Sequence, residues 1–242
     1  MPVNRLRIIA GPNGSGKTTL YFFLNENLST GIWLNADEIL ELFKKKGFIE
    51  YLLLGFVPTV QSFKIFCRKK SSQQFIKAFG LTDDLSNIHF GDFAVTNSSK
   101  SFSNELAAFL TGFFRYYLIQ KRQSITTETV FSHESKLTFV KQARKKNFRT
   151  YLYFIATSST DINILRIHSR AYKGGHNVPE EKVKSRYSKS ILLLQKSIAV
   201  FDRVYIFDNS GKEIQLIASY ENSQLEKVYA DVIPDWLNFL LK

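Results

Sequence analysis

The chain has 242 residues and a formal net charge of +12, with 44% hydrophobic and 22% charged residues, a balance that is typical of a globular protein and excludes a disordered or fibrous chain. Its single cysteine, Cys67, excludes an internal disulfide and a cysteine-based metal cluster, which suits a reducing cytosol. No uncharged run approaches the ~18 apolar residues that a membrane span needs, so we expect a soluble, cytoplasmic protein without a membrane partner.

The first expected elements are a strand over 6–10, a glycine-rich turn and a helix over 18–25. Residues 6–10 are short, mostly apolar and β-branched, and the apolar residues after the turn recur at helical spacing. The turn reads GPNGSGKTT and matches the phosphate-loop pattern G-x-x-x-x-G-K-[ST] in full. The residues expected to bind nucleotide are Gly11, Pro12, Asn13, Gly14, Ser15, Gly16, Lys17, Thr18 and Thr19.

The chemistry of this loop follows from its composition. Its glycines let consecutive N–H groups point into one concavity, and the positive end of the following helix adds to the field there. Lys17 is expected to reach the β- and γ-phosphates, and the Thr18 hydroxyl to complete a Mg²⁺ shell. We therefore predict that the loop binds ATP or GTP with Mg²⁺. The alternative is a glycine-rich turn with a chance lysine.

A second short strand is expected over 31–34, followed by a helix that Asn35 caps and that runs through Phe43. Asp37 lies at the carboxyl end of this strand, the edge at which open α/β sheets bind ligands. It is therefore a candidate catalytic base. The alternative is that Asp37 only favours a helix N-terminus through the helix dipole.

Residues 44–101 are interpreted as an insertion with at least one amphipathic helix. A strongly apolar helix is expected over 103–121, and its aromatic stripe indicates core packing. The β-rich run 124–131 predicts the next strand and contains Glu128. A carboxylate in a parallel sheet is costly unless it lies at the end of a strand near polar partners, so Glu128 is a second candidate for chemistry.

The remaining pattern alternates helices with strands. The expected elements are a helix over 135–146, a strand over 148–156, helices over 161–172 and 179–200, a strand over 204–208, a hairpin of 213–220 and 225–232, and a closing helix over 234–240. This order predicts an α/β fold with a P-loop NTPase-like parallel sheet flanked by helices, a helical insertion and a C-terminal β-hairpin. We interpret residues 1–242 as a single domain.

Most of the excess positive charge lies between residues 141 and 190, a stretch that contains twelve lysines and arginines but only three acidic residues. Such a region fits nucleic acid, an anionic small substrate or a solvated face. Arg166 and Arg170 are spaced i, i+4, so both can point at one anion. Because phosphoryl transfer needs positive groups on the transferring phosphoryl, this spacing favours a lid over 161–190. Its cationic members are Arg166, Arg170, Lys173 and Arg186, and its hinge is Gly174-Gly175.

Four segments together carry a family resemblance. They are GPNGSGKTTL (11–20), NADEI (35–39), TETVFS (127–132), and an R-x-x-x-R-x-x-x-GGHNVP run with a following RY (166–187). On these segments the chain resembles the zeta toxin family of P-loop small-molecule kinases, which are toxins of toxin–antitoxin pairs, and their chromosomal relatives. The resemblance covers most of the chain outside 44–101.

The resemblance implies a kinase that uses ATP or GTP to phosphorylate a sugar hydroxyl of a UDP-amino sugar such as UDP-N-acetylglucosamine. It implies that Asp37 is the general base and that Glu128, with Thr129 and Ser132 of the same motif, binds the substrate. Arg166 or Arg170 matches a lid arginine on the γ-phosphate. Lys173 and His176 are alternatives for the second lid contact, and His176 is otherwise structural. The family's frequent threonine is replaced by Val130. An antitoxin that blocks the nucleotide site is the implied partner.

Two alternatives remain open. The first is a kinase of polynucleotide ends, which the basic excess suggests. Against it, the basic residues cluster around the expected lid and no aromatic-basic alternation indicates stacked bases, so we do not expect nucleic acid as a partner. The second is an ATP-gated interaction module with little turnover, whose output is a partner protein.

Overall fold

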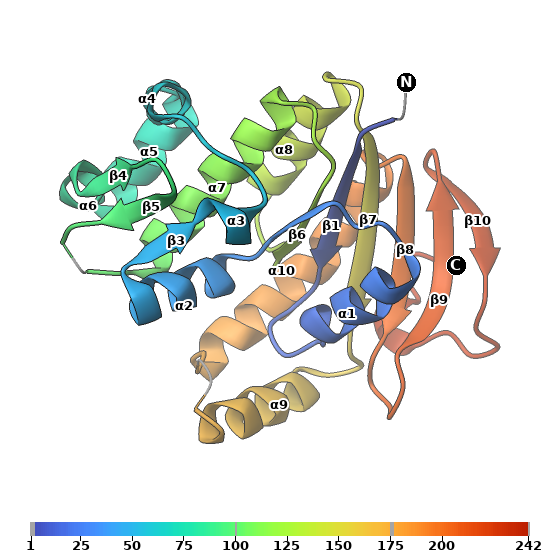
Figure 1. Ribbon diagram of the computed structural model, residues 1–242. Helices are drawn as coiled ribbons and strands as arrows, with labels where there is room; N and C mark the ends of the chain where they lie inside the picture. The colour runs from blue at the N-terminus through green and yellow to red at the C-terminus, as the bar shows by residue number, and fades with distance from the viewer. Residues whose placement is uncertain (1–2, 100, 175–176, 242) are drawn as a thin grey trace. The chain divides into compact units, whose positions relative to one another are not determined.

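The computed structural model describes residues 3–99, 101–174 and 177–241 and divides into two compact units (Figure 1). The first unit comprises residues 1–30 and 126–242, and the second comprises residues 31–125. The two units are described separately below. The single domain expected from the sequence stays a prediction, and the expected insertion 44–101 falls within the second unit.

A mostly parallel sheet forms the centre of the first unit, with the strand order β10-β9-β8-β7-β1-β6. Strands β1 and β8 flank β7 and run parallel to it, whereas β9 is antiparallel to β8 and β10 is antiparallel to β9. The predicted α/β class and the C-terminal hairpin are therefore confirmed. The strands are β1 (Arg5–Ala10), β6 (Ile125–Thr129), β7 (Arg149–Ala156), β8 (Arg203–Asp208), β9 (Gln215–Glu221) and β10 (Gln224–Val228).

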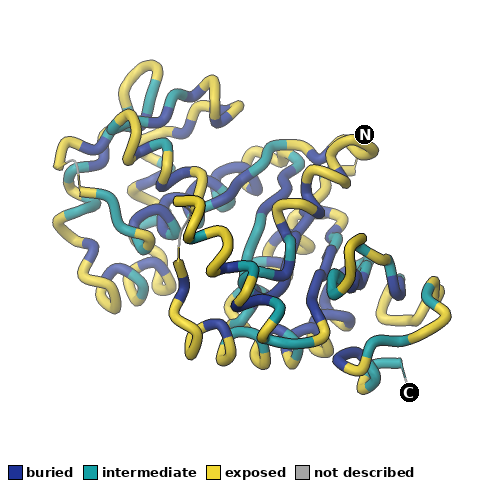
Figure 2. Tube along the Cα trace, turned by 90° about the horizontal axis from the view of Figure 1, so that it is seen from below, coloured by how far each residue is buried: buried dark blue, intermediate teal, exposed yellow. Residues whose placement is uncertain are grey.

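The central strands are apolar because both of their faces are covered. Ile8, Leu152, Phe154 and Ile206 are at most 2% exposed, as expected of parallel strands that lie between helices. Figure 1 shows α1 in front of these strands and α10 behind them, and Figure 2 shows the buried segments along the strands. The helices of this unit are α1 (Lys17–Asn27), α8 (Ser135–Arg144), α9 (Thr160–Tyr172) and α10 (Glu180–Ile198).

Three expected element ends in this unit are wrong. The second hairpin strand, expected to end at residue 232, ends at Val228. Strand β6 ends at Thr129, not at Phe131, because Phe131 takes a left-handed backbone with φ 59°. The closing helix expected over 234–240 is only the 3₁₀ turn η1 (Asp235–Leu237). Trp236 anchors this turn, since its indole Nε1–H donates to a carboxyl oxygen of Asp208 at 2.7 Å.

The indole–carboxyl bond makes Trp236→Phe informative. Asp208 is only 8% exposed, so its oxygen loses a donor that water does not readily replace. We expect the free energy of unfolding to fall by about 1–3 kcal/mol, measured by urea denaturation. The control is Trp33→Phe, because Trp33 Nε1 donates to the exposed carboxylate of Glu38 at 2.8 Å. If the two variants lost equal free energy of unfolding, the burial of the Trp236–Asp208 hydrogen bond would not explain its contribution.

The second unit combines helices with a small antiparallel sheet of order β3-β5-β4. The strand expected over 31–34 is present as β2, whereas the strands of the small sheet are not predicted from the sequence, because runs of three or four residues are too short to show alternation. Its elements are β2 (Ile32–Leu34), α2 (Ala36–Lys46), β3 (Phe48–Glu50), α3 (Tyr51–Leu54), α4 (Val60–Cys67), α5 (Lys70–Phe79), α6 (Thr82–Ser86), β4 (Ile88–Phe90), β5 (Ala94–Asn97) and α7 (Asn104–Gln120).

Aromatic packing around α7 forms the core of the second unit. Phe113 is fully buried, and its ring lies 5.0 Å from that of Phe63 and 5.7 Å from that of Phe66, measured between centroids. Phe109 also contacts Phe63 and Phe66. The predicted core role of the aromatic stripe is therefore confirmed. Among the described helices of either unit, none is long and apolar enough to cross a bilayer.

Candidate active site

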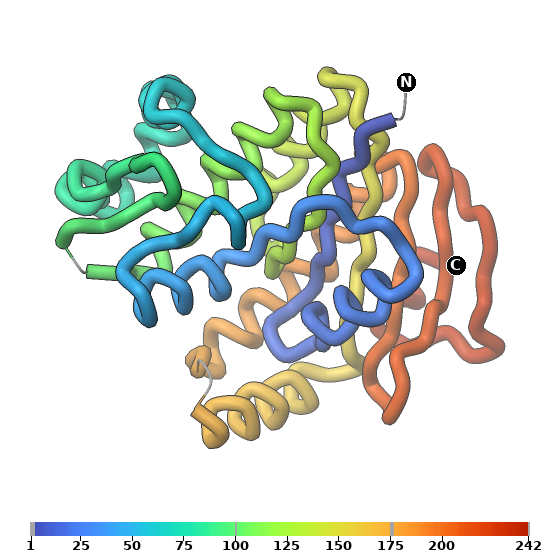
Figure 3. Tube along the Cα trace, viewed as in Figure 1, coloured from blue at the N-terminus to red at the C-terminus, as the bar shows by residue number. Residues whose placement is uncertain are grey.

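The phosphate loop joins β1 to α1 and lies at the carboxyl end of β1. Gly14 takes the left-handed conformation with φ 78°, and a Cβ there would lie 2.5 Å from the carbonyl oxygen of Asn163 on α9. Figure 3 follows the chain from β7 into α9 at the same end of the sheet. The close approach of α9 therefore requires glycine at position 14 for both conformation and space.

Gly14→Ala is expected to weaken nucleotide binding without unfolding the protein. The left-handed backbone costs a non-glycine residue about 1–2 kcal/mol, so we expect the free loop of the variant to relax away from it. Binding must then restore the strained conformation, at a loss of roughly 5- to 30-fold in affinity. Titration with a fluorescent ATP analogue measures the change. Gly211→Ala is the control, because a Cβ at Gly211 meets nothing within 4 Å. Parent affinity in Gly14→Ala would show that the loop tolerates a side chain there.

Lys17, Thr18 and Glu128 converge beside this loop. The Thr18 hydroxyl donates to Glu128 Oε2 at 3.0 Å, and Lys17 Nζ lies 3.7 Å from Glu128 Oε1. Lys17 also donates to the carbonyl of Pro12 at 2.9 Å and is 7% exposed. Since Glu128 is in the penultimate position of β6, its carboxylate has the polar partners that a strand end can supply.

The Thr18 hydroxyl and the Glu128 carboxylate are both hard oxygen donors. Mg²⁺ binds such oxygens and usually retains waters and phosphate oxygens in its shell. The donor set therefore fits the cation expected from the sequence.

Helix α10 contacts the loop and the start of α9. Arg186 Nη1 donates to Asn13 Oδ1 at 3.2 Å, which links α10 directly to the phosphate loop. The Tyr187 hydroxyl donates to the carbonyl of Thr157 at 2.5 Å. Burial, with a smaller contribution from the charge of Asp208, raises the pKa of Tyr187 to about 12. This hydroxyl therefore stays protonated and able to donate throughout the physiological pH range.

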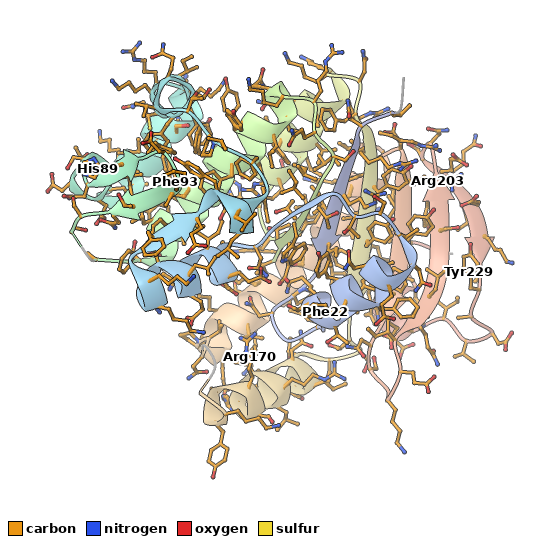
Figure 4. All side chains as sticks on the ribbon, in the orientation of Figure 1. Phe22, His89, Phe93, Arg170, Arg203 and Tyr229 are labelled. Carbon is orange, nitrogen blue, oxygen red and sulfur yellow. The ribbon has the colours of Figure 1, made fainter. Side chains whose placement is uncertain are left out.

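Three of the expected lid cations line one pocket. Arg166, Arg170 and Lys173, together with Ser169, line a cavity of about 440 Å³ along α9 (Figure 4 labels Arg170). Arg166 Nη1 is buried and has no hydrogen-bond partner among the residues that the structure describes. A buried guanidinium nitrogen without a partner is costly, and an anion bound within its reach would satisfy it. The structure thus brings these three residues together at a site suited to an anion.

The other expected site residues have different surroundings. The Thr129 hydroxyl accepts from the backbone N–H of Phe131 at 3.3 Å, and Ser132 is half-buried just beyond. Asp37 belongs to the second unit, where it is exposed at the start of α2 and its N–H donates to Asn35 Oδ1 at 2.8 Å. His176 lies outside the described residues. The roles assigned to these residues stay predictions.

Two residues at the site were missed from the sequence. Asn163 forms part of the surface of α9 against Gly14, and the side-chain amide of Asn209 donates to the carbonyl of Ser15 at 2.9 Å. Asn209 follows the last parallel strand directly, and the carboxyl ends of such strands are where ligands bind. The position of Asn209 after a predicted strand could therefore have identified it as a candidate site residue. Asn163 lies within an ordinary helical pattern, which gives no indication of a site.

The sheet, the glycine-rich loop after β1 and the lysine and threonine that open α1 define a P-loop α/β nucleotide-binding domain. A family model described as an AAA domain matches residues 6–189. The chain belongs to this AAA domain family, which is P-loop kinase-like in fold.

A curated relative from Haemophilus influenzae, an uncharacterized protein, is 31% identical over 72 residues. The match covers 30% of this chain and 51% of the relative, so the chain spans about half of that protein's length.

Solved structures share the fold at low sequence identity. The native AvrRxo1-ORF1 and ORF2 complex aligns with a TM-score of 0.55 and 16% identity, covering 93% of this chain and 61% of that one. The PezAT chromosomal toxin-antitoxin system of Streptococcus pneumoniae aligns with a TM-score of 0.50 and 13% identity, and the alignment covers 90% of this chain and 72% of that one. At these identities the likeness concerns the fold.

Proposed function

We propose that the protein is an ATP- or GTP-dependent small-molecule kinase of the zeta toxin type, with the hydroxyl of a UDP-amino sugar such as UDP-N-acetylglucosamine as acceptor. The observation that carries the proposal is the close approach, within the first unit, of the phosphate loop to α9, the helix that carries the cationic pocket. A loop of backbone donors holds a polyphosphate, and mobile cations stabilise the phosphoryl group during its transfer.

On the donor side, the loop N–H groups and Lys17 bind and orient the triphosphate. Arg166, Arg170 and Lys173 supply positive charge, and Arg186 supports the loop through Asn13. Mg²⁺ would be held by Thr18, with Glu128 beside it, and when bound it neutralises phosphate charge. The Thr18–Glu128 contact also restrains the side chain of Glu128, which the family pattern assigns to substrate binding.

On the acceptor side, Asp37 is proposed to accept the proton of the sugar hydroxyl. An aspartate fills this role in kinases generally, because the hydroxyl must lose its proton as it attacks the γ-phosphate. Glu128, Thr129 and Ser132 are proposed to bind the sugar nucleotide. These assignments rest on the matching sequence segments.

An antitoxin is the proposed protein partner. Support comes from the shared fold with the PezAT toxin-antitoxin system. Expression of the chain alone should slow growth, and Lys17→Ala should relieve the effect. Equal growth of the two strains would remove the toxin role while leaving the kinase proposal intact.

The acceptor is tested by incubating the protein with labelled ATP and a panel of compounds. The panel contains UDP-N-acetylglucosamine, UDP-N-acetylgalactosamine, UDP-glucose and an oligonucleotide with a free 5′-hydroxyl. We expect label on a UDP-amino sugar, with a mass increase of one phosphoryl group. Label on the oligonucleotide alone would establish the polynucleotide kinase instead, and nucleotide binding without any labelled product would favour the interaction module.

A further inference from the structure

Asn209 is hydrogen-bonded to the backbone of the phosphate loop. It follows β8 directly, and its backbone N–H donates to the carbonyl of Ala156 at the end of β7 at 2.8 Å. Its side-chain amide Nδ2 donates to the carbonyl of Ser15 at 2.9 Å. One residue therefore connects the ends of two parallel strands to the middle of the loop.

The bond to Ser15 determines the direction of the next N–H group. The carbonyl of Ser15 and the N–H of Gly16 belong to the same planar trans peptide, so they point in opposite directions. When Asn209 draws the Ser15 carbonyl toward itself, the Gly16 N–H is turned away from Asn209. Phosphate loops use such backbone N–H groups to bind phosphate oxygens, so the orientation of this peptide bears directly on affinity.

The glycine at position 16 is matched to Asn209. Gly16 has φ 96°, and a Cβ there would lie 2.3 Å from Asn209 Nδ2. The side-chain amide thus occupies the space that any other residue at position 16 would fill. Glycine is therefore required at position 16 for two reasons. It adopts the left-handed backbone, and it leaves room for the side chain of Asn209.

Hydrogen bonds fix both neighbours of Asn209, which are Asp208 and Ser210. The Asp208 carboxyl accepts from the Ser210 N–H at 2.8 Å, from the Ser210 hydroxyl at 2.9 Å and from Trp236 at 2.7 Å. The Ser210 hydroxyl in turn accepts from the N–H of Ser158, just before α9, at 2.8 Å. A donor held this firmly loses little conformational entropy when it bonds the loop.

We infer that Asn209 is a positioning residue for nucleotide binding, which acts by orienting the Ser15–Gly16 peptide. The inference rests on the proposed nucleotide binding at this loop and adds a specific requirement to it. The amide is needed as a hydrogen-bond donor, whereas a purely structural role would need only its volume. These two roles predict different results for substitutions at position 209.

The test compares Asn209→Leu, which keeps approximately the volume of the amide without a donor, with Asn209→Ala, which loses both. The matched control is Asn27→Leu, because Asn27 Nδ2 also donates to a backbone carbonyl, that of Phe23 at 3.1 Å, but away from the loop. Affinity for ATP is measured by calorimetry on the full chain, and thermal unfolding without nucleotide is recorded in parallel.

We expect both Asn209 variants to bind ATP roughly 3- to 10-fold more weakly, the loss associated with one neutral hydrogen bond. Asn27→Leu should bind like the parent. Parent-like affinity in Asn209→Leu with a loss in Asn209→Ala would overturn the inference, because volume alone would then suffice. A loss of ATP affinity that only parallels a lower melting temperature would also overturn it. A parent that binds no ATP at all would instead defeat the proposed function.

Discussion

Lys17→Ala is expected to reduce phosphate transfer by about 10²- to 10³-fold, the cost of removing one donor that stabilises transition-state charge. The Lys17 side chain is 7% exposed, and its ammonium contacts the Pro12 carbonyl and the Glu128 carboxylate, so it is held at the loop before nucleotide arrives. Steady-state transfer from labelled ATP measures the effect. Nucleotide binding should weaken as well, since the lysine is proposed to contact the phosphates in the ground state too.

Lys145→Ala provides the control for charge, because Lys145 is an exposed lysine in the basic region 141–190 but outside the expected lid 161–190. It removes an equal charge away from the proposed site and should leave transfer unchanged. If Lys17→Ala and Lys145→Ala both transferred phosphate at the parent rate, the loop would not be the donor site.

Asp37→Asn is expected to lower the transfer rate by about 10²- to 10⁴-fold while leaving ATP affinity close to the parent value. The amide keeps the size of the side chain but cannot accept a proton from the acceptor hydroxyl. The substitution should therefore act on the rate of transfer and not on nucleotide binding. Single-turnover transfer and ATP titration on the same protein separate the two quantities.

Glu38→Gln tests the competing explanation for Asp37. Both carboxylates lie in the first turn of α2, so both interact favourably with the helix dipole. Glu38 instead accepts from Trp33 Nε1. If a helix-end role were sufficient, the two variants would lose activity and stability to similar extents. A selective loss of transfer in Asp37→Asn would support catalysis.

The elements that the sequence predicts well are those with strong local signals. The loop between β1 and α1 can be predicted because its glycines, lysine and threonine have a fixed spacing. The apolar strand that the motif requires comes directly before it in the sequence. Helix α2 begins after Asn35, as its capping pattern predicts, and α7 is long and strongly periodic. Each of these features is contained within one short, continuous stretch of chain.

The features that were missed depend on contacts across long stretches of sequence. Asn209 reaches Ser15 from a position 194 residues away, and no local pattern reports such a pairing. The strands β3, β4 and β5 are three or four residues long and exist only because they pair with one another. The closing segment is limited to one 3₁₀ turn, where Trp236 bonds Asp208. Its apolar spacing alone suggested a longer helix.

The proposed reaction transfers the γ-phosphate of ATP, bound at the phosphate loop, to a hydroxyl of a UDP-amino sugar. Phosphorus NMR of the protein mixed with ATP and UDP-N-acetylglucosamine follows the phosphoryl group directly, with Lys17→Ala as the inactive reference. We expect the γ-phosphate resonance to decline while a phosphomonoester resonance on the sugar grows in step with it. Loss of the γ-phosphate only to inorganic phosphate, with the sugar nucleotide unchanged, would contradict the proposed reaction.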